Sequence, residues 1–447
     1  QCLVGSEMCI RDRDIDTNTS FNDELTVNMG GTDEKVKITA DIRVPECDTM
    51  SVTEVERIPC TKEFKEKVIK AYFGDSQVYY YDYAHMTKKE LEEIIETLDR
   101  DNNSLSDDAS EEILKWHDDM KTECTKALET AADVWTEATE YDSCDDFVGK
   151  IGDTWFHLQF SRAEDDNSVL SGIQSYPLDR CVKRVSDGEP DERSTIFDDG
   201  YVKQYYGPKS LKEYDTVRYL NGDFIVGDMP VSDVNEANIS FDEAKKKAGD
   251  FMQAIGIESM IKTGESDCEW EGYNKTEDNV YKEGDVHRAI WGYALEYSLG
   301  ADDVVYSKSL NIFDYSAYYS KFPSMGCPNY ETGSFNVNEY GVYRFDIAEP
   351  VSIVKKQQKV ELLPVSNIYK IARNELESHP DKYIVEADTQ YRYLTLGYIR
   401  VKDSSDSQRF SYIPAWSLEL LQRREVESCP VFVNAIDGTV IEPEQIF

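Results

Sequence analysis

Two hydrophobic periodicities recur in blocks along this chain, and their order constrains the fold more than any other feature. Residues 35–44 alternate apolar and polar side chains, as a half-buried strand does. Helical signals follow at 61–73 and 87–98, the second with Thr87 and Glu90 spaced as a capping box. A regular strand-helix-strand alternation is not seen. The sequence therefore predicts an α+β fold of helices packed on antiparallel sheets, and not a doubly wound parallel sheet.

The second half of the chain repeats this pattern of helix followed by strands. Its strongest helix signal is 240–256, with a capping box at Ser240 and Glu243 and a stop at Gly256. A further helix is expected around 368–376. The segments enriched in β-branched and aromatic residues, which are typical of strands, are 289–299, 341–347, 390–401, 410–420 and 431–441.

A chain of 447 residues has room for two or three domains. We expect residues 1–13 to be an artefactual tail and 14–182 to form an N-terminal α+β domain. We expect 183–235 to be a linker region, because its first part combines Gly, Pro and charges with little periodicity. The remaining residues, 236–447, are expected to form a C-terminal α+β domain that folds alone.

The first residues do not resemble a structural element. Residues 2–13 resemble a translated sequencing adapter, because 3–12 read LVGSEMCIRD, the translation of a transposon-end adapter used in DNA-sequencing libraries. Such a segment would overwrite the place where a signal peptide stands. We therefore expect the native N-terminus and its targeting signal to be missing.

The balance of acidic and basic residues limits the classes of partner that the protein can bind. The chain has 88 Asp and Glu residues against 48 Lys and Arg residues, a formal net charge of −40. A field of this sign repels phosphate backbones, so no nucleic-acid partner is expected. The mean hydropathy is −0.57, and no apolar run approaches the ~18–20 residues of a membrane span.

Motifs that carry chemistry are weak. Two of the ten cysteines lie in the tail; the others are Cys47, Cys60, Cys124, Cys144, Cys181, Cys268, Cys327 and Cys429. The chain has no C-x-x-C pair, no H-E-x-x-H, no nucleophile elbow and no phosphate loop. We therefore assign no catalytic, cofactor-binding or metal residue and expect no cofactor. Free thiols and disulfides both remain open, with Cys47 and Cys60 as the first pairing expected for a short-range bridge.

An acidic run at 99–111 begins like a calcium loop. It differs from a calcium loop at Ser104, where the sharp turn requires Gly, and at Ser110, where a bidentate Glu is needed. A solvated linker between two helices is the better interpretation. A longer helix is expected over about 111–139, and His117 on it is expected in a surface or core role. The tyrosine cluster 79–81 is interpreted as strand and not as a platform for sugars.

A family resemblance rests on two stretches, the helix 240–256 and the terminal block 394–444. The block contains Pro414-Ala415-Trp416 and an N-A-I-D-G motif at 434–438. Together they resemble an uncharacterised family of lipoproteins from Gram-positive anaerobes, whose C-terminal part is similar to PepSY-type extracytoplasmic modules. We expect Trp416 to anchor a core and Gly438 to supply a turn with positive φ.

The resemblance implies a cell-surface location through a lipid on a missing N-terminal cysteine, the only membrane contact expected. It implies no catalytic residues. We hypothesise a non-enzymatic, extracytoplasmic binding or accessory protein whose partner is a protein, peptide or cell-envelope component. A strand edge of 236–447 or the groove beside it would bind the partner. The alternative is a glycan-active or amide hydrolase that uses carboxylates.

Overall fold

The described part of the chain falls into several stretches. The computed structural model describes residues 20–29, 31–47, 49–104, 111–152, 154–163, 166–178, 181–183, 209–211, 216–219, 231–257, 260–273, 286–301, 304–306, 331–357, 359–383, 390–403, 406–420 and 430–446. The predicted tail 1–13, most of the predicted linker 183–235 and residues 105–110 of the acidic run lie outside the described residues.

The described strands form two sheets, one of eight strands and one of twelve. Most neighbouring strands run antiparallel, and the parallel pairs are β10 with β12 and β17 with β2. Helices pack on these sheets, which confirms the predicted α+β class. None of the helices in the described residues is long and apolar enough to cross a bilayer.

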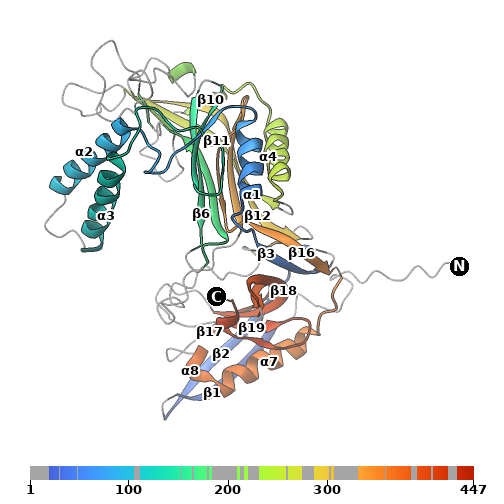
Figure 1. The fold of residues 1–447 in the computed structure, drawn as a ribbon. Coiled ribbons are helices and arrows are strands. Elements are labelled where there is room, and N and C mark those ends of the chain that lie inside the picture. Colours follow the sequence, from blue (N-terminus) through green and yellow to red (C-terminus); the bar gives the residue numbers. More distant parts are fainter. Residues whose placement is uncertain are drawn as a thin grey trace.

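The eight-stranded sheet combines the first and the last described strands of the chain, so we call it and its helices the terminal unit (Figure 1). Its strands are β1 (Ser20–Met29), β2 (Thr32–Arg43), β3 (Val52–Arg57), β16 (Val351–Gln357), β17 (Gln390–Asp403), β18 (Asp406–Leu420), β19 (Val431–Asn434) and β20 (Val440–Ile441). Its helices are α7 (Val365–Ser378), α8 (Pro380–Tyr383) and α9 (Pro443–Ile446).

The twelve-stranded sheet comes from the middle of the chain, and we call it and its helices the central unit. Its strands are β4 (Val78–Tyr80), β5 (Asp146–Ile151), β6 (Thr154–Arg162), β7 (Leu170–Pro177), β8 (Cys181–Lys183), β9 (Thr216–Tyr219), β10 (Val231–Asn235), β11 (Met260–Tyr273), β12 (Val286–Ala301), β13 (Val304–Val305), β14 (Thr332–Asn338) and β15 (Gly341–Ala348). Its helices are α1 (Lys62–Phe73), α2 (Lys88–Ser104), α3 (Glu111–Leu128) and α4 (Phe241–Ile255), with a short 3₁₀ turn at Lys209–Leu211. Helices α1 and α4 pack together on the sheet, while α2 and α3 form a hairpin beside it (Figure 1).

The predicted domain boundaries do not follow the two sheets. Strand β2 lies beside β17 in the terminal unit, and β7 lies beside β15 in the central unit. Each sheet therefore takes strands from both 14–182 and 236–447. The physical reason is that a stretch containing Gly and Pro indicates a loop, and a loop can connect two strands of the same sheet as well as two domains.

Local patterns explain why the individual elements form. The alternation in β2 buries Val36, Ile38 and Ala40 on one face. In the hairpin of β19 and β20, Gly438 has a φ of 81°, which a side chain would strain. Trp416 is buried in the core of the terminal unit. The expected roles of Trp416 and Gly438 are confirmed.

The predicted capping boxes are present. Ser240 accepts a hydrogen bond from the backbone of Glu243, whose carboxylate accepts one from the backbone of Ser240, and α4 ends at Gly256 in the left-handed region. The same reciprocal pair joins Thr87 and Glu90 before α2. Helix α3 ends at Leu128, although the apolar pattern predicted helix to 139, because the residues after it form an isolated bridge, Tyr79 with Glu137, along β4.

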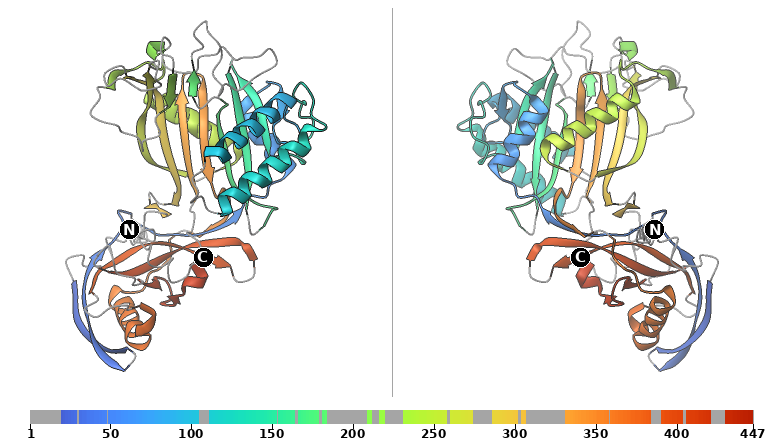
Figure 2. Two further views of the ribbon diagram at one scale, coloured as in Figure 1. Left: turned by 90° about the vertical axis from the view of Figure 1, so that its left-hand side faces the viewer. Right: turned by 90° about the vertical axis from the view of Figure 1, so that its right-hand side faces the viewer.

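The two units touch where the chain crosses between them (Figure 2). Tyr306, after β13, lies in the core of the terminal unit, where its hydroxyl hydrogen bonds that of Thr53 at 2.7 Å. Its ring stacks on Tyr412 with 4.2 Å between centroids. Gln408 of β18 donates to Asp166 of the central unit at 2.8 Å. Each unit otherwise has its own hydrophobic core.

Candidate functional site

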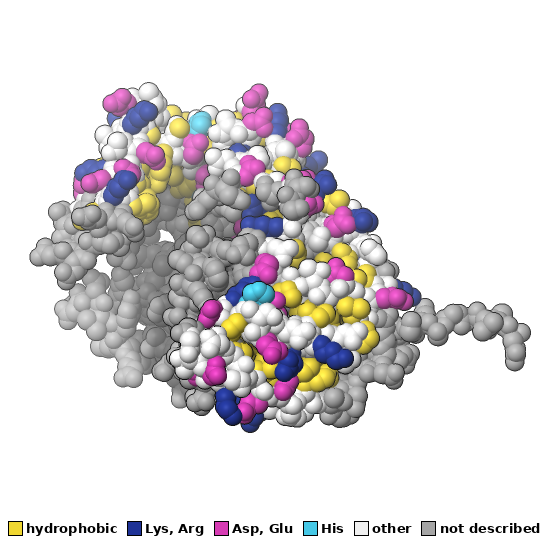
Figure 3. Space-filling view, turned by 90° about the horizontal axis from the view of Figure 1, so that it is seen from below, with side chains coloured by type: hydrophobic (Ala, Val, Ile, Leu, Met, Phe, Trp, Pro, Cys, Tyr) yellow, Lys and Arg dark blue, Asp and Glu magenta, His cyan; other side chains and the backbone are white. Residues whose placement is uncertain are grey.

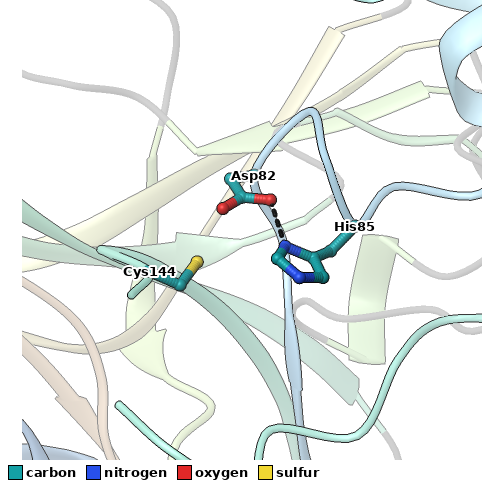
Figure 4. Close-up of side chains that lie close together, drawn as sticks. All are labelled: Asp82, His85 and Cys144. Carbon is teal, nitrogen blue, oxygen red and sulfur yellow. Dashed lines mark hydrogen bonds and ion pairs between the residues drawn. The ribbon is translucent and has the colours of Figure 1, made fainter. Parts of the chain in front are cut away.

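Three chemically different side chains meet at one end of β4 and β5 (Figure 4). Asp82 and His85 belong to the turn after β4, and Cys144 lies just before β5. Each offers one ligand atom, and these atoms lie within 4.8 Å of one another. The antiparallel pairing of β4 with β5 brings the turn and the cysteine together.

The turn that carries Asp82 and His85 is fixed by its backbone. The backbone N–H groups of His85 and Met86 both donate to the carbonyl oxygen of Asp82, each at 3.0 Å. Nδ1 of His85 lies 2.5 Å from Oδ1 of Asp82, and the His85 ring lies 4.6 Å from that of Tyr80. Both side chains of the pair are 30% exposed, so the site opens to solvent on their side.

Cys144 forms the buried side of the cluster. Its Sγ donates to the carbonyl oxygen of Asp146 at 2.9 Å. Burial raises the pKa of Cys144 to about 12, and the Asp82 carboxylate acts in the same direction. A cysteine nucleophile needs a lowered pKa, so Cys144 at neutral pH is a thiol and not an activated nucleophile.

A buried lysine holds the loop before β5. Lys65 of α1 donates from Nζ to the carbonyl oxygens of Tyr141 at 2.9 Å and Cys144 at 2.7 Å. It also forms an ion pair with Asp145 at 2.5 Å, and its side chain is 1% exposed. Because three oxygens depend on one ammonium group, Lys65 is a positioning residue for Cys144.

Asp145 completes this charge cluster. Arg162 binds both carboxylate oxygens of Asp145, at 2.5 and 2.9 Å. Burial alone would raise the pKa of Asp145, but hydrogen bonds from Arg162 and Lys65 outweigh it and hold the pKa below its usual value. The ionised carboxylate is thus the form that the cluster stabilises.

Cys60 donates to Asp145 over 3.8 Å, and burial raises the pKa of its thiol. Cys60 and Cys47 are not joined, so the predicted short-range disulfide is wrong. The reason is that Cys47 belongs to the core of the terminal unit and Cys60 packs against that of the central unit.

A second polar group lies on the strands next to the cluster. Asp146 of β5 is hydrogen bonded to Nε2 of His157 and to Gln159, both at 2.9 Å. Nδ1 of His157 lies 2.6 Å from the hydroxyl of Tyr176 on β7. With every one of these polar atoms paired inside the sheet surface, the arrangement is that of a structural network.

The sequence patterns assign no binding or catalytic role to Asp82, His85 or Cys144. The signal that could have found two of them is the Asp82-x-x-His85 spacing, which suits ligands on one turn. Asp99, the first residue of the acidic run, lies in α2 and pairs with Lys121 of α3. His117 is buried on α3, in agreement with the surface or core role expected for it.

No protein-family model matches the chain, and no curated protein matches its sequence. Among solved structures, the chain is similar to an uncharacterized protein from Eubacterium rectale ATCC 33656. The similarity covers 94% of this chain and 93% of that chain, with 12% sequence identity and a TM-score of 0.33. A similarity at this level carries no argument about function.

Proposed function

We propose that the protein is a non-enzymatic, extracytoplasmic binding or accessory protein that binds an extended segment of a partner protein along strand β1. The observation that carries this proposal is the edge formed by β1. Among the described strands it pairs with β2 alone, in continuous register from Ser20 to Met29. An edge strand of this kind presents backbone donors and acceptors to an added strand.

The inner face of β1 is anchored, so the edge is a fixed template. Leu25 and Val27 are buried in the core of the terminal unit. The ring of Phe21 stacks on Tyr369 of α7 at 4.1 Å, and Asp23 pairs with Arg373 of the same helix at 2.6 Å. The alternate side chains of β1 face solvent.

Two other described sheet edges, β16 and β4, carry features that oppose strand addition. Strand β16 has a bulge at Val354, followed by exposed Lys355 and Lys356. Such bulges and lysines are the features by which proteins protect edges. Strand β4 is short, and its outer side is bridged through Tyr79 to Glu137. Of the edges that 236–447 contributes to the terminal sheet, β16 is thus protected and β20 has two residues, whereas β1 is better suited to pairing.

The charge of the whole chain favours a cationic partner segment. The two carboxylates of β1, Asp23 and Glu24, already pair with Arg373 and Lys35, but the strand has neither Lys nor Arg, and the chain has a formal net charge of −40. On the described part of the underside in Figure 3, acidic and basic side chains are interspersed with hydrophobic ones. A basic, extended peptide would gain backbone hydrogen bonds from the edge and faster association from the protein's field.

The test is selection of random phage-displayed peptides on the full chain, followed by amide hydrogen exchange. We expect the selected peptides to be basic and to slow exchange within residues 20–29. Thr26→Lys should weaken their affinity by up to about fivefold through like-charge repulsion, and Ser352→Lys on β16 should not. Failure to select any peptide, or protection confined to other strands, would overturn the proposal.

The cell-surface location, the lipid anchor and the PepSY-like nature of the C-terminal part belong to the same proposal. They rest on the family resemblance, supported by the order of helix α7, the long pair β17 and β18, and the hairpin of β19 and β20. The intact upstream coding sequence tests the location. We expect it to encode a basic segment, an apolar segment and a cysteine shortly before residue 14; a start codon opening directly into the Asp-rich segment would contradict this.

A further inference from the structure

The cluster of Asp82, His85 and Cys144 presents one oxygen, one nitrogen and one sulfur donor within 4.8 Å of one another. This donor set is selective. Calcium and magnesium take oxygen ligands and avoid thiols. Zinc takes cysteine sulfur, histidine nitrogen and carboxylate oxygen, commonly in fourfold coordination.

The donors are positioned before any ion arrives. The turn 82–85 is closed by its own backbone hydrogen bonds, and the backbone N–H of Tyr81 donates to the carbonyl oxygen of Asp146 at 2.9 Å, which ties the turn to β5. On the other side, the bond from Lys65 fixes the carbonyl of Cys144. Both segments that carry ligands are therefore attached to the same sheet, which lowers the cost of organising a metal site.

We propose that Asp82, His85 and Cys144 bind one Zn²⁺ ion, with solvent completing the coordination on the exposed side. The charges support this assignment. A carboxylate and a thiolate balance the two positive charges of the ion, and the imidazole is neutral. The bound site thus carries no net charge in its half-buried position, where an unbalanced charge would be costly.

Binding replaces contacts that the side chains make with one another. The ion takes the place of the hydrogen bond between His85 and Asp82, and the thiol proton of Cys144 leaves to solvent as the sulfur binds the metal. The bound ion would link the turn after β4 to the start of β5. We therefore expect zinc to raise the midpoint of thermal unfolding of the full chain.

Cobalt(II) added to the metal-stripped full chain tests the site, because a thiolate bound to cobalt gives a charge-transfer band in the near ultraviolet. We expect the band to saturate at one ion per chain and to disappear on addition of zinc chloride. The Cys144→Ser variant should lack the band. Loss of a supporting group alone weakens metal affinity about 10–100-fold, so Asp82→Asn and His85→Gln should weaken cobalt binding by more than about 100-fold.

Cys60→Ser is the matched control, since Cys60 is a partly buried thiol hydrogen bonded to Asp145 and lies outside the cluster. This variant should keep the band and its affinity. Thermal unfolding without metal shows whether each variant is folded. A band that persists in Cys144→Ser, a band lost in Cys60→Ser, or no band in the folded wild type would each overturn the zinc site.

Discussion

The terminal and central units differ in where their buried polar groups lie relative to solvent. In the terminal unit, buried tyrosine hydroxyls make neutral hydrogen bonds: Tyr398 accepts from the backbone of Ser51 at 2.9 Å, and Tyr391 donates to the carbonyl of Tyr383 at 3.0 Å. These bonds join parts of the chain that already pack together. They contribute to a single arrangement of the terminal sheet.

In the central unit, one cluster of buried charged groups lies beside an opening to solvent. Lys65 and Asp145 pair beneath Cys144, and the turn 82–85 lies above it. Charged groups are costly to bury and need complete pairing. The tyrosine hydroxyls of the terminal unit thus stabilise packing inside the core, whereas the charged cluster of the central unit holds a partly exposed loop in place.

The largest effect would come from separating the strands that the two chain ends contribute to the terminal unit. Expressed alone, residues 236–447 lack β1, β2 and β3, so β17 loses its neighbour β2, and β16 and β18 lose their neighbour β3. Each lost core side chain, such as Val36 or Ile38, contributes about 1.5–3 kcal/mol, against a total stability of about 5–15 kcal/mol. We expect no cooperative thermal unfolding by near-ultraviolet circular dichroism.

The control for the truncation is a chain that starts at residue 14, which keeps every described strand and should unfold cooperatively. If 236–447 instead gave a sharp transition with native-like tyrosine signals, the interleaved terminal unit would be refuted and the predicted C-terminal domain restored.

The next effect tests the charged interior of the central unit. Lys65→Met removes the shared donor from Tyr141, Cys144 and Asp145 while keeping most of the side-chain volume. Breaking a buried pair by removing one partner costs about 3–5 kcal/mol. Urea unfolding should show this loss. Lys62→Met on the exposed face of the same helix is the control and should change the free energy of unfolding by less than about 1 kcal/mol. If the two variants lost equal stability, Lys65 would not be the group that holds the loop before β5.

Local elements of both units could be predicted from sequence, and their pairing could not. The alternation in β2 indicates which side chains are buried, but it holds no information on the strand beside it. That neighbour is β17, near the other end of the chain, in a parallel pair that needs no turn signal. Helix α4 was predictable to its ends because a capping box and a glycine stop act within a few residues.

The candidate zinc site follows the same rule. The spacing of Asp82 and His85 is local and visible, whereas Cys144 joins them only through the pairing of β4 with β5. Cysteine-pair motifs do not reveal a site that contains a single cysteine. The Cys47 and Cys60 prediction was wrong for the converse reason, since residues close in sequence lie in two different cores.

A smaller effect, visible as a pH dependence, tests the junction of the two units. Burial raises the pKa of Glu331, although Arg400 and the hydroxyl of Tyr412 favour its ionised form. An unfolded glutamate ionises near pH ~4.3. Above that pH the folded state holds the proton that the unfolded state has lost, so this group's stabilisation is complete below the unfolded pKa and is lost as pH rises through the folded pKa.

Glu331→Gln removes this titration. Wild-type stability measured by guanidinium unfolding should therefore fall relative to the variant as pH rises from about 4 toward neutral. The change should be smaller than that caused by Lys65→Met, because Arg400 and Tyr412 offset part of the burial. If the wild type instead became more stable relative to Glu331→Gln over this pH range, the attraction of Arg400 would outweigh the effect of burial, and the pKa of Glu331 would be lowered.

The smallest effect compares how the two units begin their long helices. Helix α4 of the central unit starts with a complete capping box at Ser240, whereas α7 of the terminal unit starts at Pro364 without a side-chain cap. Ser240→Ala should cost about 1 kcal/mol, because backbone donors of the first turn lose their partner. Ser366→Ala, at an exposed position inside α7, should change stability by less than about 0.5 kcal/mol. Both losses in the free energy of unfolding are measured from the midpoints of urea unfolding, with the same dependence on urea concentration assumed for each variant. Equal losses would mean that α4 is held only by its packing on α1, β12, β14 and β15, and that its cap, the clearest helix signal in the sequence, contributes nothing to the fold.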